Sequence, residues 1–200
     1  MSFIGYTYLH LTGALAITSL SSENPLFKQS LLPLIAENIL ALIILYLMMY
    51  NRPGPLKYIL FVLFCLLIGQ ILSPGVKAAQ KKGTLRTVLA SVAGIFLAMT
   101  VLGFIDNQNM LGLGAYLFAA LMGLILARFV LIAINISEPT PLGLENTNNL
   151  LSWASTTLFA LFVAYDTQRL KEKQQKPYDY INSSVGLFLD IINLFSSENR

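Results

Sequence analysis

Long apolar stretches alternate with short polar breaks along the whole chain. An α-helix crosses a bilayer core of about 30 Å with roughly 20 mostly apolar residues. Six stretches meet this requirement, near residues 4–21, 32–50, 56–74, 86–105, 111–134 and 148–167, and a weaker seventh lies near residues 179–195. The pattern predicts an all-α fold, a polytopic transmembrane helix bundle of six spans plus a seventh C-terminal helix that either spans or re-enters the membrane.

Turn-forming residues occupy the breaks between these stretches. Pro and Gly end helices, and Asn, Asp and Ser side chains satisfy the backbone groups that are then left free. The breaks lie at residues 21–25, 51–55, 73–75, 106–109 and 138–141. Because all of them are short, they leave no room for a soluble domain, and we interpret residues 1–200 as a single transmembrane domain.

The composition favours a surface that faces lipid. The chain is 56% hydrophobic and 12% charged, whereas soluble domains carry about 25% charged residues. The formal net charge is +3, but the Lys and Arg residues lie mostly in the breaks, where phospholipid headgroups would meet them. They form no basic face with interleaved aromatic residues, so the expected partner is the lipid bilayer, and nucleic acid is excluded.

Catalytic and cofactor chemistry has few visible parts. His10 is the only histidine and Cys65 the only cysteine, which excludes an intrachain disulfide and a thiolate metal cluster. No nucleophile, base and orienting group occur together at a recognisable spacing. We therefore expect neither an enzyme nor a bound cofactor.

Charge alone does not decide the orientation in the membrane. With six spans, Arg52, Lys57 and the basic cluster at residues 169–176 share the side of the N-terminus, while the cluster at residues 77–86 lies opposite. The break that contains Glu138 and Glu145 has no Lys, which favours an outer position for it and a cytosolic N-terminus.

Two predicted spans carry stripes of small side chains. The stripes recur every four residues, as Ala90, Gly94 and Ala98 in one span and Ala115, Ala119, Gly123 and Ala127 in the next. In lipid, small residues allow helix backbones to approach closely. We therefore predict that these stripes pack helices together within the bundle.

Four ionisable residues lie inside predicted spans: Glu37, Arg128, Asp166 and Asp190. Such a side chain costs a few kcal/mol at the centre of a membrane, so it generally pairs, faces water or has a function. For three of them a structural role is also open. Glu37 could match the helix dipole near the start of its span, Arg128 could reach the headgroups, and Asp166 could pair with Arg169.

Asp190 lies on a small and polar stripe of the last helix. Ser183, Gly186 and Asn193 share its face at helical spacing, and apolar residues fill the other faces. Such a stripe is expected to face the bundle interior and to form a helix-packing surface. Asp190 then either serves a function or belongs to a polar seam that only orients this helix.

Two C-terminal motifs resemble those of a known family. Residues 164–168 (AYDTQ) and 186–195 (GLFLDIINLF) resemble the paired motifs of the transmembrane Bax inhibitor motif family. Residues 7–11 (TYLHL) and the number of spans also resemble that family, so the similarity covers nearly the whole chain as a single Bax inhibitor-like domain. In the family the two matching aspartates form a hydrogen-bonded pair near the cytosolic end, and members behave as pH-sensitive calcium leaks that modulate cell death.

The resemblance implies that Asp166 and Asp190 are the gate and pH sensor and hold calcium transiently. Two carboxyl groups in contact cannot both ionise cheaply, so they tend to share one proton. The shared proton would hold two helices together. Its loss would leave two charges that repel each other and can attract a divalent cation.

The resulting hypothesis is a pH-modulated cation leak with calcium as the permeant ion and calcium and protons as its partners. Glu37 and Arg128 are then a pathway acid and a counter-charge. Two alternatives remain: an interaction protein that regulates partner membrane proteins without conducting ions, and a proton-coupled transporter. The expected location is the endoplasmic reticulum or Golgi membrane for a eukaryotic or viral chain and the plasma membrane for a bacterial one.

Overall fold

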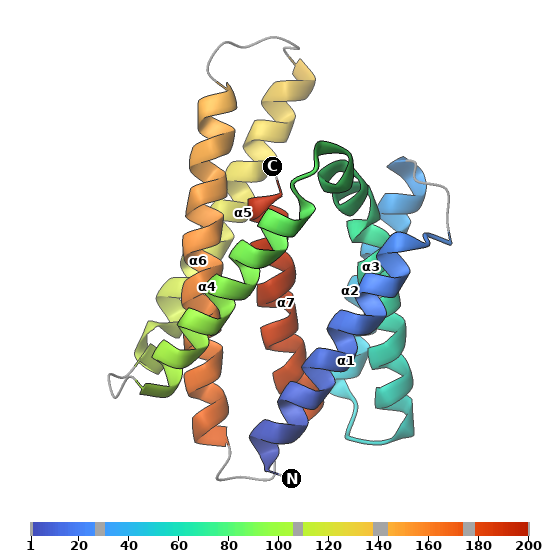
Figure 1. The fold of residues 1–200 in the computed structure, drawn as a ribbon, viewed down its shortest axis with the longest axis vertical. Coiled ribbons are helices and arrows are strands. Elements are labelled where there is room, and N and C mark those ends of the chain that lie inside the picture. The colour runs from blue at the N-terminus through green and yellow to red at the C-terminus, as the bar shows by residue number, and fades with distance from the viewer. Residues whose placement is uncertain (1, 27–30, 106–109, 138–143, 174–178, 200) are drawn as a thin grey trace. The chain divides into compact units, whose positions relative to one another are not determined.

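The computed structural model describes residues 2–26, 31–105, 110–137, 144–173 and 179–199. Within these residues the chain forms seven α-helices and one short 3-10 helix, which confirms the all-α prediction (Figure 1). The elements are α1 (Phe3–Glu23), α2 (Leu31–Tyr50), α3 (Pro55–Lys82), α4 (Leu85–Ile105), η1 (Met110–Leu113), α5 (Gly114–Ser137), α6 (Leu144–Lys173) and α7 (Tyr180–Glu198). Glu138 and the predicted breaks at 106–109 and 138–141 lie outside the described residues, so the orientation inferred from Glu138 stays a prediction.

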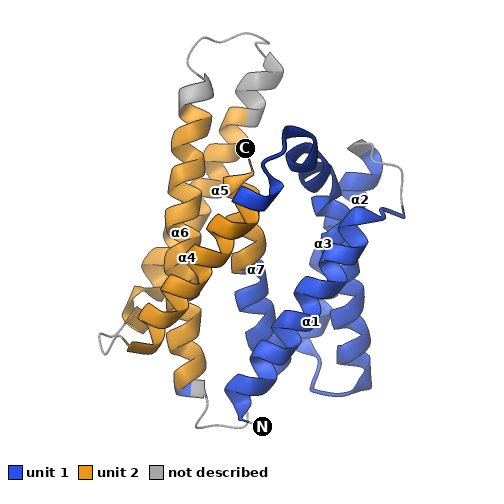
Figure 2. Ribbon diagram, viewed as in Figure 1, with its two compact units in different colours: residues 1–87, 172–189 blue, residues 88–171, 190–200 orange. Residues whose placement is uncertain are grey.

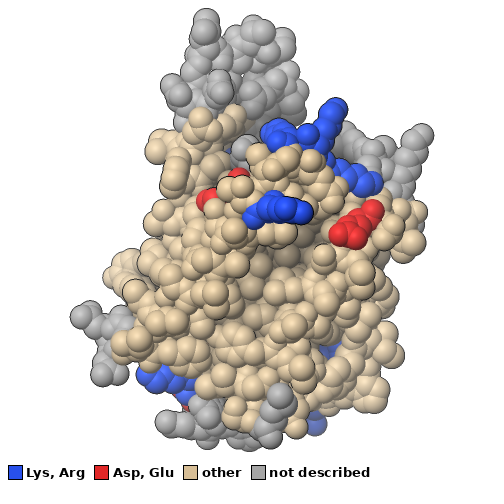
Figure 3. Space-filling model, in the orientation of Figure 1, with Lys and Arg blue, Asp and Glu red and all other residues tan. Residues whose placement is uncertain are grey.

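Four helical segments of the described chain are long and apolar enough to cross a membrane: Leu32–Tyr50, Pro55–Lys82, Leu85–Ile105 and Met110–Leu131. Large apolar side chains are exposed on them, as in Leu42, Phe118 and Phe129, which are 61–66% exposed. On the face drawn in Figure 3, Lys and Arg form a few small groups and uncharged residues make up most of the surface. Such a surface suits lipid.

The other three α-helices are more polar. Helices α1, α6 and α7 have 21, 30 and 19 residues, and even the shortest is about 28 Å long at about 1.5 Å per residue. Length therefore allows each of them to cross a bilayer. Their assignment as further spans, including the choice between a spanning and a re-entrant α7, stays a prediction.

The predicted break at residues 73–75 is wrong, because α3 continues through Pro74 and ends at Lys82. A proline inside a helix bends it instead of ending it when good helix formers follow, and the last part of α3 runs in a different direction from its first part (Figure 1). The helix ends at Gly83, whose φ of 71° is left-handed and whose N–H donates to the Gln80 carbonyl at 3.0 Å. Gly83 therefore provides the stop signal that we assigned to Pro74.

The helices form two compact units (Figure 2). The first unit comprises residues 1–87 and 172–189, and the second comprises residues 88–171 and 190–200. Helix α7 contributes to both, because the boundary falls between Leu189 and Asp190.

In the first unit α1 and α2 both pack on α3. A Cβ atom at Gly69 would lie 2.6 Å from the Thr18 carbonyl oxygen and from Ser21 Cβ, so only glycine fits between α1 and α3. At this contact Thr18 Oγ1 donates to the Cys65 carbonyl at 3.0 Å, and Ser21 Oγ donates to the Leu66 carbonyl at 2.8 Å. Close packing and hydroxyl hydrogen bonds are the interactions that hold helices together in lipid.

In the second unit α4 packs closely on α6. A Cβ atom at Gly103 would lie 2.6 Å from the Ala164 carbonyl oxygen and 2.9 Å from Thr167 Cβ. One turn beyond this contact, Lys171 Nζ donates to the Phe104 carbonyl at 3.0 Å. The C-terminal ends of α4 and α6 therefore lie side by side.

The small-residue stripes of α4 and α5 do not pack helices within the described chain, so that prediction is wrong. Cβ atoms at Gly94 and Gly123 would meet nothing within 4 Å, and the alanines of the two stripes are exposed or half-buried. The close contacts use Gly69 and Gly103 instead. Spacing alone could not identify them, because a helix in lipid is apolar on its outer and inner faces alike.

Candidate functional site

The structure brings together the two aspartates of the sequence motifs. Asp166 lies half-buried on α6, and Asp190 lies on α7 with 6% of its surface exposed. Both belong to the second unit. The two carboxyl groups are close enough to interact electrostatically. Two acids from separate motifs therefore form one local site.

Neighbouring helices hold the backbone of α6 on both sides of Asp166. Thr167 packs against Gly103 of α4, where no side chain could fit. Tyr165 lies against Gly114 at the start of α5, where a Cβ atom would come within 2.7 Å of the Tyr165 hydroxyl. These contacts fix the α6 backbone on both sides of Asp166.

Asp190 has an unusual environment for a carboxyl group. Its Oδ2 atom is buried and accepts no hydrogen bond from the described residues, and the same is true of the hydroxyl oxygen of the nearby motif residue Thr167. Buried oxygens of this kind are costly in a protein interior. A proton or a cation that bound there would supply the interaction that Asp190 Oδ2 lacks.

The oxygen ligands of the pair suit calcium better than softer metals. In the described part of the chain, no three His, Cys, Asp or Glu side chains come together as a metal site. Calcium prefers six to eight oxygen ligands. An ion at this pair would therefore take most of its ligands from water.

The stripe around Asp190 is less distinctive in the structure than in the sequence. Ser183, Gly186 and Asn193 are half-buried. The apolar faces of α7 are buried at least as deeply, since Val185, Phe188 and Leu194 are 3%, 0% and 0% exposed. Burial thus does not single out the stripe, and the helix-packing role of Ser183, Gly186 and Asn193 stays a prediction.

Glu37 is buried on a different helix. It is 7% exposed and shares a face of α2 with the buried residues Ala41, Ile44 and Met48, so this face packs on α3. It lies about two turns into α2, which begins at Leu31, whereas the dipole effect fades beyond the first turn. Glu37 belongs to the first unit, and its role as a pathway acid stays a prediction.

Arg128 contacts α6. Its Nη2 atom donates to Ser155 Oγ at 3.0 Å and to the Leu151 carbonyl at 3.5 Å. Arg128 also lines a cavity of about 460 Å³. Its role as a counter-charge of the aspartates stays a prediction.

The sequence analysis missed a buried ion pair between Lys57 of α3 and Asp179, the residue before α7. Lys57 lies inside the predicted span 56–74, and the structure agrees, because α3 begins at Pro55 and Lys57 lies in its first turn; what the sequence did not indicate is its burial, with 1% of its surface exposed. Lys57 Nζ also donates to the Asn51 carbonyl at 3.1 Å. The sequence signal that places Lys57 in the first turn of a helix is Pro55, since proline is favoured at the first position of a helix.

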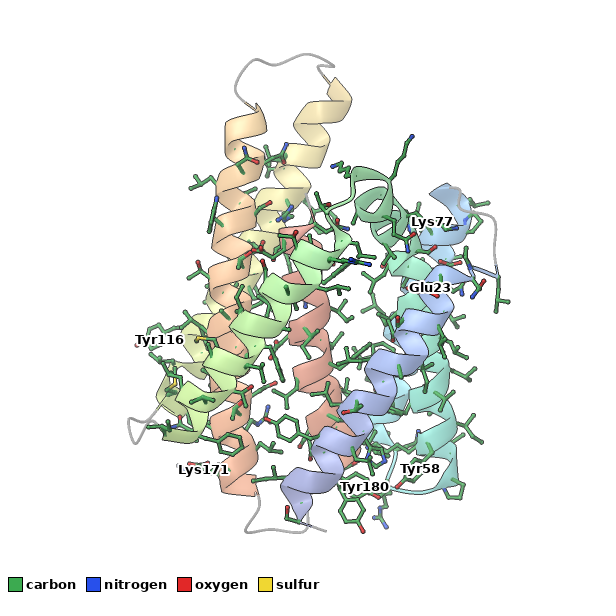
Figure 4. All side chains as sticks on the ribbon, viewed as in Figure 1. Glu23, Tyr58, Lys77, Tyr116, Lys171 and Tyr180 are labelled. Carbon is green, nitrogen blue, oxygen red and sulfur yellow. The ribbon has the colours of Figure 1, made fainter. Side chains whose placement is uncertain are left out.

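An aromatic cluster lies beside this ion pair in the first unit. The hydroxyl groups of Tyr58 and Tyr180 are hydrogen-bonded to each other (Figure 4). The ring of His10 lies 4.9 Å from that of Tyr180 and 5.8 Å from that of Tyr58, measured between centroids. Tyr6 stacks on Tyr180 at 5.4 Å. The start of α7 is therefore fixed to α1 and α3.

Comparisons with known proteins agree with the two motifs. A family model described as "Inhibitor of apoptosis-promoting Bax1" matches residues 1–197. Bax inhibitor 1 of Schizosaccharomyces pombe is 28% identical over an alignment that covers 98% of this chain and 73% of that protein. Inner membrane protein YbhL of Escherichia coli is 28% identical over 193 residues, which cover 90% and 76%. An uncharacterized protein of Deinococcus radiodurans is 27% identical over 209 residues, which cover 97% and 87%.

Proposed function

Because this chain belongs to the Bax inhibitor family of integral, multi-pass membrane proteins, we propose that it is a pH-modulated cation leak with calcium as the permeant ion. The observation that carries the proposal is the juxtaposition of Asp166 and Asp190, with an Asp190 carboxyl oxygen that is buried and accepts no hydrogen bond from the described residues.

A shared proton is the proposed closing element. With one proton between them, the two carboxyl groups attract each other and hold α6 against α7. When the proton leaves at higher pH, two negative charges face each other in a poorly solvated site. Their repulsion separates the helices, and the freed oxygens attract a divalent cation.

The second half of α7 is the segment that we expect to move. Its start is held by the ion pair of Lys57 with Asp179 and by the hydrogen bond of Tyr58 with Tyr180. Asp190 lies about 16 Å further along the helix at about 1.5 Å per residue. Repulsion at Asp190 therefore acts beyond the anchored end, where displacing the helix leaves those contacts intact.

The family description and the name of the yeast relative refer to the inhibition of Bax and of apoptosis. We propose that this chain modulates cell death where such a pathway exists, by lowering the calcium content of the compartment that its membrane encloses.

A second candidate function is that of an interaction protein. The observation that favours it is the outward position of Gly94 and Gly123, which leaves two small-residue helix faces uncovered among the described residues. Such faces allow the helices of another membrane protein to approach closely. This candidate requires a partner, whereas a leak does not.

Calcium flux from liposomes that contain only the purified chain distinguishes the two functions. A leak predicts flux in lipid alone that rises with pH when it is measured between about pH 6 and about pH 8, because loss of the shared proton leaves two charges that repel each other. Flux equal to that of protein-free liposomes at every pH would contradict the leak and favour the interaction protein.

A further inference from the structure

A cavity of about 460 Å³ lies in the second unit and is lined by residues of α5, α6 and the end of α7. Its volume is within the range of about 300–1,000 Å³ typical of ligand pockets. Its polar lining comes from Arg128, Ser155, Asn193, Ser196 and Ser197. The rest of its wall is apolar. The cavity thus presents one cation and several hydroxyl groups beside an apolar surface.

Arg128 has hydrogen-bonding capacity to spare. Nη2 makes both of its contacts, with Ser155 and with the Leu151 carbonyl. A guanidinium group has five N–H donors in a planar fork, and the Nη1 and Nε atoms of Arg128 donate to no described residue. The fork matches the oxygens of a phosphate group, which it can bind through two parallel hydrogen bonds.

The residues around the cavity are of the kinds found at the depth of the lipid headgroups. Trp153, the only tryptophan of the chain, is 72% exposed on α6 between Leu151 and Ser155, the two residues that Arg128 contacts. Tryptophan is enriched where membrane meets water. The α6 sequence before it is polar at residues 145–149. Arg128 and Trp153 are therefore both residues that suit the boundary between the apolar core and the headgroups.

The end of α7 brings negative charge next to the cavity, because Glu198 follows Ser197, a lining residue, although Glu198 itself does not line the cavity. Thr156, which follows Ser155 on α6, donates to Ser197 Oγ at 2.9 Å and to the Glu198 carboxylate at 3.0 Å. The carbonyl groups at the end of α7 add the negative end of a helix dipole. Consecutive residues of α6 thus hold a cation on one side and a carboxylate on the other.

An apolar ridge leads away from Arg128 along α5. Leu121, Ile125 and Phe129 line the cavity at intervals of four residues, and Ile125 and Phe129 are 38% and 65% exposed. Residues at this spacing form one continuous ridge on a helix. A ridge of this kind in lipid gives an acyl chain a surface to lie on.

We propose that this cavity binds a zwitterionic phospholipid, phosphatidylethanolamine. The phosphate binds Arg128 and the serine hydroxyls, the ammonium group faces Glu198 and the carbonyl end of α7, and one acyl chain lies along Leu121, Ile125 and Phe129. An anionic headgroup such as phosphatidylglycerol satisfies Arg128 but offers no cation to Glu198. The site therefore selects for headgroup chemistry and not for negative charge alone.

The test is lipid binding to the purified full chain in detergent, counted by native mass spectrometry with phosphatidylethanolamine and phosphatidylglycerol of identical acyl chains. We expect one phosphatidylethanolamine to bind at least about tenfold more tightly than phosphatidylglycerol, and Arg128→Gln to weaken it by about tenfold or more through loss of a charge-assisted contact. Arg86→Gln, at an exposed cation on α4, is the matched control and should change nothing. Glu198→Gln should reduce the preference between the two lipids.

A second variant tests the site without removing Arg128. Ser196 is exposed and lines the cavity, so Ser196→Trp should fill the cavity, leave the fold intact and abolish tight binding. Equal binding of both lipids, or binding that survives both Arg128→Gln and Ser196→Trp, would overturn the proposal. Displacement of the lipid by inorganic phosphate alone would do so as well, because it would show an anion site without a lipid component. The readout is lipid binding and not flux, so its failure leaves the proposed leak untouched.

Discussion

The buried ion pair between Lys57 and Asp179 at the start of α7 allows the loss of folding stability in variants of either residue to be predicted. The Lys57 side chain has no exposed surface, whereas that of Asp179 is 16% exposed. Removing one partner of a buried pair costs about 3–5 kcal/mol when it leaves the other charge unpaired. Asp179→Asn leaves the Lys57 ammonium with only the Asn51 carbonyl as a described acceptor. We expect this variant to lose stability within that range.

Lys57→Met should be milder for two reasons. Asp179 keeps the N–H groups of Ile181 and Asn182, which donate to its Oδ1 at 3.0 and 3.4 Å, and its partial exposure leaves it in contact with water. Methionine also keeps most of the volume of the buried lysine stem. We expect a loss of about 1–3 kcal/mol, in line with a hydrogen-bonded charge that retains other donors.

The double variant Lys57→Met/Asp179→Asn should be no less stable than Asp179→Asn alone. It leaves no unpaired charge, and asparagine still caps the start of α7 because it is as good an N-cap as aspartate. The two single losses should therefore exceed the loss in the double variant by about 2 kcal/mol or more. Arg52→Met, at an exposed cation nearby, is the control and should change stability by less than about 0.5 kcal/mol.

The single cysteine provides the assay. Cys65 is fully buried, so a thiol-reactive fluorogenic dye reports unfolding in detergent as the temperature rises. At about 2–4 °C per kcal/mol for a chain of this size, Asp179→Asn should lower the melting temperature by roughly 10 °C. Losses that add in the double variant, or an Asp179→Asn variant as stable as the wild type, would refute the ion-pair reasoning.

Two further predictions concern packing and topology. Gly103→Ala should lower the melting temperature, because its Cβ would lie 2.6 Å from the Ala164 carbonyl oxygen and overpacking costs about 1–3 kcal/mol. Gly94 has open space around it, so the control Gly94→Ala should be neutral or stabilising. Equal effects of the two substitutions would contradict the described contact of α4 with α6. Arg52 lies just before α3 and Lys82 is its last residue. In a Cys65→Ala background, single cysteines at these two positions should react with a membrane-impermeant thiol reagent from opposite sides of the membrane. Labelling of both from the same side would show that α3 does not span.

The helices and the aspartate pair could be predicted from the sequence because each depends on a local signal. The length of an apolar stretch identifies a possible transmembrane span without any information from the rest of the chain. Asp166 and Asp190 are conspicuous because a charge inside an apolar segment is costly, and the family resemblance joined two motifs that lie apart in the chain. The structure places both acids in one unit, close enough to interact.

The contacts that failed prediction depend on which face of a helix turns inward. Gly94 and Gly69 look alike in the sequence, yet Gly94 meets open space and Gly69 meets the backbone of α1. The ion pair of Lys57 was not predicted because its partner, Asp179, lies far away in the chain. Pro74 was interpreted as a helix end because proline commonly ends a helix. Whether α3 continues beyond Pro74 depends on the residues that follow it.

The measurement that tests the central claim most directly is liposomal calcium flux between about pH 6 and pH 8 for Asp166→Asn, Asp190→Asn and the double variant. The control is Glu23→Gln, which changes an exposed acid of α1. If the two carboxyl groups share one proton, each single variant removes the repulsion that opens the leak and loses most of the pH response. The double variant should lose little more, because groups that act as a unit are not additive. An unchanged pH response in both single variants would contradict the account and leave Asp166 and Asp190 as structural residues.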